Sequence, residues 1–248
     1  MRVLKVVAEG ITTSFRYPQF MQQIHPTYEM PPPATIYGHI ASTLGEWFDP
    51  KDVRFAYRFT FSGQGNDIEN ILVATLASGY LKSTKIPKVL AGSVNPFERA
   101  ILFQPRLTLY VNRPEWEDAF LSPCYPVLLG RSQDLFIYTS ISVVELEQAP
   151  FAYFEHTLLP YSTTQYTSHG YAVYMPRYLD YNNNRQPTVA RYFIVRNRLD
   201  SRDHFLWFGE KPDERYWIDP QSPDHKGAKL GLAFLSFVGK EDETITVS

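Results

Sequence analysis

The stretch EMPPPATIYGHIASTLGEW, residues 29–47, places three prolines in a row directly before a helical pattern of apolar residues. A proline disfavours the α-helical conformation of the residue before it, so Pro31–Pro33 predict an extended approach and a sharp helix start at Ala34. We expect this helix to stop at Asp49-Pro50. The apolar residues at helical spacing are Ile36, Tyr37, Ile40, Leu44, and Trp47 or Phe48.

The first turns of this helix carry groups that suit an anion. A helix N-terminus has unpaired N–H groups, and Thr35 adds a hydroxyl, so a phosphate is favoured there. Gly38 is a poor helix former, and its missing side chain leaves room for a ligand to approach closely. The alternative is an ordinary strand-to-helix junction with a glycine needed for packing, and these residues alone leave both interpretations open.

The flanking segments predict an α+β fold. Before the helix, RVLKVVAEG (2–10) has the pattern of a buried strand, and four further β-rich segments and a short helix follow. The strand-helix-strand-strand-helix-strand order over residues 1–150 suggests a ferredoxin-like sandwich. The later segments are VRFAYRFTFSG (53–63) with NILVATLASGYL (70–81), ILFQPRLTLYVN (101–112), the helix RPEWEDAF (113–120) and LFIYTSISVVELE (135–147).

Residues 82–102 interrupt this order with a tract that is too polar for a core and too long for a simple turn. It carries Lys82, Lys85, Lys88 and Arg99. We interpret it as an inserted hairpin or arm, with a solvated basic loop as the alternative.

Residues 151–248 begin with a loop-rich tract and continue with three strand candidates. They form either a second small β domain or strands that extend the first sheet.

Composition narrows the possible functions. With 44% apolar residues the chain supplies a real core, and a net charge of −2 means that any polyanion site must be local. Cys124 is the single cysteine, which excludes an intrachain disulfide and a Cys-rich zinc site. The six histidines do not have the spacing of metal ligands, so we expect no metal and no cofactor. No catalytic motif is present, and no apolar run approaches the length of about 18 residues that spans a membrane. We therefore expect a cytoplasmic, membrane-independent protein that is not an enzyme.

A second candidate site lies in YPVLLGRSQDLFIY, residues 125–138. Gly130-Arg131-Ser132 follows an apolar run and suits a backbone turn that presents one arginine to a phosphate or carboxylate. A plain surface loop is equally compatible with these residues.

Together, TTSFRYPQF, PPPATIYGHIASTLG and, about 80 residues later, LLGRSQDL resemble the Cas-five subunits of type I CRISPR surveillance (Cascade) complexes, within the RAMP superfamily. The resemblance covers about the first 150 residues, the size of one domain. It implies an RRM-like domain at 1–150 with an inserted thumb hairpin at about 82–102, followed by a variable β-rich region at 151–248. The long form of the first motif favours a subtype I-B-like system.

The resemblance also implies a role. Such a subunit binds the 5′ handle of the guide RNA (crRNA), caps one end of the complex and contacts the first Cas-seven backbone subunit through its thumb. It also meets the Cas-eight large subunit near the protospacer-adjacent motif of the target DNA. Cas-six shares the complex, and transposition proteins join it if the system is transposon-associated.

Carried over by position, the resemblance assigns two groups of residues. The RNA-facing residues would be Arg16, Tyr17, Thr35, Tyr37, Gly38, His39, Lys82, Lys85, Lys88, Arg131 and Ser132. The thumb would contact its partner through Ile86, Val89, Leu90, Val94, Phe97 and Arg99.

Two rival hypotheses place the protein in other functional classes. One is a metal-independent endoribonuclease that processes the precursor RNA, which needs a base and a cation close together. The only adjacent Lys-His pair, His225-Lys226, lies in a polar loop near the C-terminus, away from the expected position of a cleaving site. The other is a protein–protein adaptor that touches no RNA, which requires the basic arm and Arg131 to face solvent.

Overall fold

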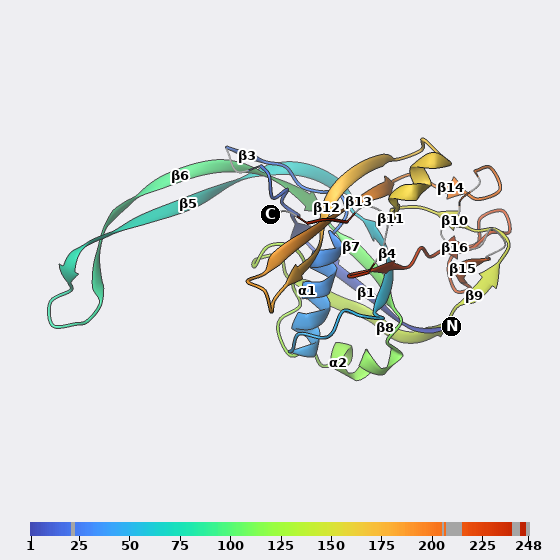
Figure 1. Cartoon of the computed structure of the whole chain (residues 1–248), viewed down its shortest axis with the longest axis horizontal. Coiled ribbons are helices and arrows are strands. Elements are labelled where there is room, and N and C mark those ends of the chain that lie inside the picture. The colour runs from blue at the N-terminus through green and yellow to red at the C-terminus, as the bar shows by residue number, and fades with distance from the viewer. Residues whose placement is uncertain (21–22, 205, 207–214, 240–243, 247–248) are drawn as a thin grey trace.

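A five-stranded antiparallel sheet forms the centre of the computed structural model, which describes residues 1–20, 23–204, 206, 215–239 and 244–246, with backbone alone at 74–76, 90–91 and 244–246. Its strand order is β8-β1-β7-β4-β17 (Figure 1). In β1 the apolar residues Val3, Leu4, Val6 and Val7 are all buried, as expected of a central strand covered on both faces. The strands are β1 (Arg2–Gly10), β4 (Arg54–Thr60), β7 (Arg106–Val111), β8 (Phe136–Glu145) and β17 (Leu235–Ser236).

Helix α1 (Pro33–Leu44) packs on this sheet and follows the rules that its sequence sets. Pro32 precedes it in an extended conformation with φ −57° and ψ 148°, and Pro33 is the first helical residue. The helix ends before the expected stop at Asp49-Pro50. Gly45 ends it, because Gly45 adopts a left-handed conformation with φ +80° and its N–H donates a hydrogen bond to the carbonyl oxygen of Ala41. A short 3₁₀ turn, η1 (Pro114–Trp116), and helix α2 (Glu117–Leu121) then contact β1 and β8.

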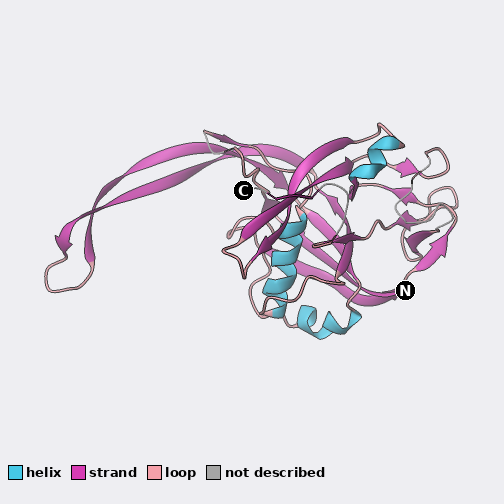
Figure 2. Ribbon diagram, in the orientation of Figure 1, coloured by secondary structure: helices cyan, strands magenta, loops and turns pink. Residues whose placement is uncertain are grey.

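A long two-stranded arm projects from the body of the molecule (Figure 2). It consists of β5 (Gly63–Tyr80) and β6 (Pro87–Phe103), paired antiparallel, and at about 3.3 Å per residue it reaches roughly 50 Å. The sequence-based arm at 82–102 was therefore too short, because the apolar pattern of β5 looks like a core strand. Ile68 and Leu72 are nevertheless 70% and 76% exposed.

Two short strands hold the base of the arm. The first, β2 (Thr12–Thr13), pairs antiparallel with the end of β6, and β3 (Ile24–His25) pairs parallel with residues Glu98 and Arg99.

Residues after 150 build a second β layer that shares a core with the first sheet. Strands β11 (Thr157–Pro160), β13 (Gln186–Val195) and β12 (Tyr171–Asp180) form one sheet, which β18 (Thr244–Thr246) extends. One apolar cluster joins Ile36 and Ile40 of α1 to Met175 and Tyr192 of this sheet and to Phe237. Helix α1 therefore lies between β sheets from both halves of the chain.

The remaining strands form a small sheet at the end of the molecule opposite the arm (Figure 1). Its strands are β9 (Glu147–Ala149), β10 (Tyr153–Phe154), β14 (Leu199–Asp200), β15 (Tyr216–Asp219) and β16 (Leu230–Gly231). The 3₁₀ turn η2 (Tyr161–Gln165) lies outside this sheet and packs on β12 and β13.

Replacing Gly45 with alanine should destabilise the chain beyond the ordinary cost of a left-handed residue. That backbone conformation costs about 1–2 kcal/mol for a residue with a Cβ, and here the added Cβ would lie 2.6 Å from Sγ of Cys124. Gly227→Ala is the matched control, since Gly227 has φ +82° and open space around it. Urea denaturation should give the larger loss for Gly45→Ala, and equal losses would contradict this account of the helix end.

Candidate nucleic-acid groove

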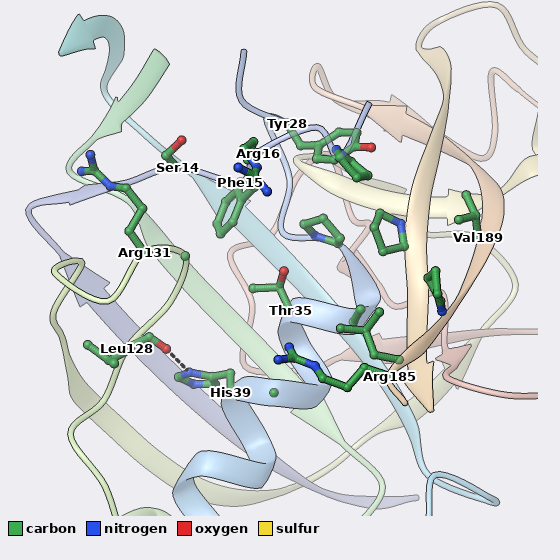
Figure 3. Close-up of a pocket in the computed structure, with 18 of the residues that line it drawn as sticks. Ser14, Phe15, Arg16, Tyr28, Thr35, His39, Leu128, Arg131, Arg185 and Val189 are labelled. Atoms are coloured by element: carbon green, nitrogen blue, oxygen red, sulfur yellow. Dashed lines mark hydrogen bonds between the residues drawn. The ribbon is translucent and has the colours of Figure 1, made fainter. Parts of the chain in front are cut away.

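A groove of about 1110 Å³ lies where the start of α1 meets the loop after β2, the 128–132 loop and strands β12 and β13 (Figure 3). It brings together six residues that the sequence analysis assigned to RNA from three separate segments. These are Arg16, Thr35, Gly38, His39, Arg131 and Ser132.

Gly38 faces open space in this groove. A Cβ built on it would meet no atom within 4 Å, so packing does not require a glycine at this position. No side chain caps the start of α1, and the N–H groups of Thr35 and Ile36 donate to the carbonyl of Pro32 at 2.8 and 3.1 Å. The groove floor at Thr35 and Gly38 is therefore formed by a tight helical turn with no side chain projecting from Gly38.

His39 lines the same groove but is buried, and it joins α1 to the 128–132 loop. Its Nδ1 lies 2.8 Å from the carbonyl oxygen of Leu128, and its Nε2 lies 3.1 Å from the hydroxyl of Tyr138. Burial lowers the pKa of His39, so the ring is neutral near pH 7, donates through Nδ1 to Leu128 and accepts at Nε2 from Tyr138.

The 128–132 loop depends on Gly130. Its φ is +107°, and a Cβ would overlap Oγ1 of Thr13 and lie 2.9 Å from the carbonyl oxygen of Ser14. Only glycine fits this turn, and the next residue, Arg131, is thereby directed toward the base of the arm.

The sequence predicted a turn that presents Arg131 to a phosphate or a carboxylate, and in the structure Arg131 makes a network of ion pairs with carboxylates of the chain itself. Its guanidinium donates to both carboxylate oxygens of Asp134 at 3.0–3.2 Å and to Oε1 of Glu69, in β5, at 2.5 Å. The other oxygen of Glu69 accepts from Nε of Arg99, in β6, at 2.6 Å. Burial raises the pKa of Glu69, but hydrogen bonds from Arg99 and Arg131 outweigh it and leave the pKa lowered, so the bridge is ionic.

Tyr37 and Tyr17 do not line the groove, contrary to expectation. The Tyr37 ring is 1% exposed, contacts Phe48 and Tyr178, and donates from its hydroxyl to the carbonyl of Phe48. Tyr17 is half-buried and stacks on Tyr28 at 3.6 Å. Both rings are occupied by aromatic packing.

The lysines of the arm lie far from the groove. Lys82, Lys85 and Lys88 are exposed near the tip of the β5–β6 hairpin (Figure 1). The structure thus separates them from the arginines with which the sequence analysis grouped them.

The expected partner-contacting residues divide into two groups. Ile86, Val89 and Val94 are 56–58% exposed on the outer arm, whereas Phe97 and Arg99 are buried at its base. The Phe97 ring packs against His25 with ring centroids 4.3 Å apart. The side chain of Leu90 lies outside the described residues.

Strands β12 and β13 supply a wall of the groove that the sequence analysis missed. Tyr174, Tyr181 and Arg185 line it, and the Arg185 guanidinium lies 5.5 Å from the centre of the Tyr181 ring. The signal was the run Asn182–Arg185 between two alternating segments, which is typical of a hairpin turn. A hairpin assignment alone, however, does not say that the turn folds back over α1.

The charged side chains that line the groove are of one sign. Arg16, Arg99, Arg131 and Arg185 are among its described lining residues, and none of those lining residues is a carboxylate. Glu69 and Asp134 neutralise Arg99 and Arg131 from behind, while Arg16 and Arg185 have no ion pair with any described residue. This chain of net charge −2 therefore concentrates positive charge at the groove.

The Lys-His pair of the rival nuclease hypothesis lies elsewhere. His225 Nδ1 is 2.7 Å from a guanidinium nitrogen of Arg198, and the Lys226 carbonyl accepts from Arg202. Neither residue lines the groove. Among the described residues, no cluster of three or more His, Cys, Asp or Glu could hold a metal ion, and no helix is long and apolar enough to cross a membrane.

Replacing Glu69 with glutamine should loosen the base of the arm, because one neutral amide cannot hold two guanidiniums. We expect faster amide hydrogen exchange in the paired residues 97–103, and a loss of about 1–2 kcal/mol in the free energy of unfolding. Glu98→Gln is the control, since it removes the same charge from an exposed position of the arm, where the carboxylate accepts a hydrogen bond from the side chain of Asn66. Equal exchange rates in the two variants would rule out Glu69 as the anchor of the arm.

No protein-family model matches this chain, and no curated protein is significantly similar to it in sequence. Its structure is similar to a chain of a solved "CRISPR RNA-guided surveillance complex", with a TM-score of 0.52 and 15% identity over 86% of this chain and 95% of that one. Lower scores relate it to a CRISPR protein from Archaeoglobus fulgidus (TM-score 0.44, 11% identity, 79% of this chain and 87% of that one) and to a Cas protein (0.36, 13%, 81% and 93%). The first likeness extends over most of both chains, and at 15% identity it concerns the fold.

Proposed function

We propose that this chain is a CRISPR-associated RNA-binding subunit that holds and caps the 5′ handle of the crRNA in a type I Cascade complex. The observation that carries this proposal is the groove. Four arginines line it, of which Arg16 and Arg185 have no ion pair with any described residue, and none of its described lining residues is a carboxylate, in a chain of net charge −2. RNA backbones are held by arginines, and a local site of this kind needs no globally basic protein.

The fold supports the same assignment. The strand order β8-β1-β7-β4, with α1 after β1 and α2 after β7, supports a ferredoxin-like, RRM-like domain, for which the order 4-1-3-2 is expected. The TM-score of 0.52 with a chain of a CRISPR surveillance complex is consistent with a RAMP-type subunit.

The arm is the proposed thumb. Its outer half exposes Leu72, Ile86, Val89 and Val94, and a two-stranded ribbon by itself has no core in which to bury such residues. We assign this surface to the first Cas-seven backbone subunit. The Cas-eight large subunit and Cas-six would be further partners in the same complex, with the target DNA near its protospacer-adjacent motif, in a subtype I-B-like system.

Binding without cleavage is the favoured form of this function. His225 and Lys226 lie outside the groove, and His39, the histidine inside it, is buried and hydrogen-bonded through both ring nitrogens. A general base needs a ring nitrogen within reach of the proton that it removes.

Filling the groove at Gly38 should abolish RNA retention without unfolding the chain. Gly38→Leu adds a side chain into open space and improves helix propensity by about 0.8 kcal/mol, so the melting temperature should not fall. The assay is the amount of crRNA that co-purifies with the tagged subunit and with its complex. Gly63→Leu, at another glycine with open space but outside the groove, is the control, and undiminished RNA with Gly38→Leu would overturn the proposed site.

Incubating the purified chain with precursor repeat RNA in EDTA should leave the RNA intact while the two still form a complex. Gel analysis of labelled RNA checks both results at once. Specific cleavage products that disappear in His225→Ala would favour the endoribonuclease alternative instead.

A further inference from the structure

The two sides of the groove differ in chemistry. One side comes from residues before position 133, and five of its polar and charged members, here called the backbone wall, are Ser14, Arg16, Thr35, Arg131 and Ser132. Apolar residues such as Phe15, Tyr28 and Leu128 line the same side, but Phe15 and Tyr28 are only 3% and 1% exposed, so their rings offer a ligand little surface. The other, the hairpin wall, comes from β12, β13 and their turn: Tyr174, Pro176, Leu179, Tyr181, Pro187 and Val189. Apart from the tyrosine hydroxyls, the side chains of this second set are apolar or aromatic, and Arg185 adds a cation at the turn.

The hairpin wall is fixed in place before any ligand arrives. The Tyr28 hydroxyl donates to the carbonyl of Tyr174 at 2.7 Å, which ties the wall to the chain beside Arg16. At the other end, the Tyr181 ring stacks on Trp47 at 3.6 Å, next to the end of α1. A wall held at both ends loses little conformational entropy on binding, so its aromatic surface is available at low cost.

An exposed aromatic surface opposite a row of cations suits one form of RNA. In a single strand the phosphates can face one side while splayed bases face the other and stack on aromatic rings. A duplex presents phosphates on its outside and buries its bases, so an apolar wall has nothing to contact. Tyr174 is 47% exposed and offers such a surface within the groove.

We infer that the groove takes unpaired RNA in one orientation, with phosphates on the backbone wall and bases against the hairpin wall at Tyr174. This inference rests on the proposed RNA-binding function and adds the strandedness and facing of the ligand. It also gives the C-terminal region a direct part in recognition. Figure 3 shows the two sides, with Arg16, Thr35 and Arg131 on elements of the first half of the chain and Arg185 and Val189 on the second.

The test uses two probes with the full-length chain: an oligouridylate of about eight nucleotides, and a ribose-phosphate chain of the same length without bases. Tyr174→Ala should weaken binding of the oligouridylate roughly tenfold and leave binding of the abasic chain unchanged. Tyr174→Phe keeps the ring and should bind both probes as the unmodified protein does. Tyr125→Ala removes an equally exposed tyrosine outside the groove and should change neither affinity.

The salt dependence of the binding constant distinguishes the contribution of the backbone wall from that of the hairpin wall. Arg16→Met should weaken the binding of both probes equally. It should also reduce the slope of log K against log salt concentration by about 0.7, because one phosphate contact is lost, whereas Tyr174→Ala should leave this slope unchanged.

Three results would overturn the inference while leaving RNA binding intact. The first is that Tyr174→Ala weakens the binding of both probes equally. The second is that Arg16→Met weakens the binding of the oligouridylate alone. The third is that a duplex of the same length binds as tightly as the single strand. Failure of the unmodified protein to bind either probe would overturn the proposed function together with this inference.

Discussion

The carboxylate of Glu69 joins the base of the arm to the 128–132 loop, in addition to the strand pairing of β2 and β3 with β6. One oxygen accepts from Arg131 in the 128–132 loop and the other accepts from Arg99 in the returning strand of the arm. The arm is a two-stranded ribbon, which is marginal by itself in water, so its direction depends on how its base is anchored. Because both arginines also line the groove, this pair of ion pairs fixes the root of the arm and one side of the groove at the same time.

The groove depends in the same way on helix α1. The helix packs between the central sheet and the β12–β13 layer, so its first turns cannot shift without disturbing one apolar cluster that includes both layers. His39 adds a polar connection from α1 to the carbonyl of Leu128. The groove is therefore bounded by packed elements on each side, which lowers the entropic cost of binding a ligand there.

Features set by short-range rules could be predicted from the sequence. The helix start, expected at Ala34 and observed one residue earlier at Pro33, follows from local conformational preferences and periodicity. So do the glycine turn at 130, the strands β1, β7 and β8 and the hairpin turn of the arm. The helix end was misplaced, because whether Gly45 takes a left-handed conformation is decided by what packs beyond it. Tertiary packing likewise decided that Tyr37 is buried among Phe48, Tyr178 and Phe237, the last from 200 residues further along the chain.

Charged residues were the least predictable part of the site. The pattern around Arg131 gave no sign that Glu69, 62 residues earlier, would approach it, because β5 looked like a core strand. Arg185 could not be assigned to the groove either, since the turn that carries it gives no indication of which surface it covers. Ion pairs and cavity walls depend on contacts between distant segments, and periodicity says nothing about those.

One consequence concerns synthesis of the chain. The groove is lined by residues from Ser14 to Val189, so it closes only after most of the polypeptide has left the ribosome and β12 and β13 have docked on α1. Contacts of such long sequence separation form late, because closure of the intervening loops costs entropy first. A nascent chain that ends near residue 150 has the arginine-bearing side of the groove without the aromatic side. Formation of the complete groove is thus coupled to completion of the fold.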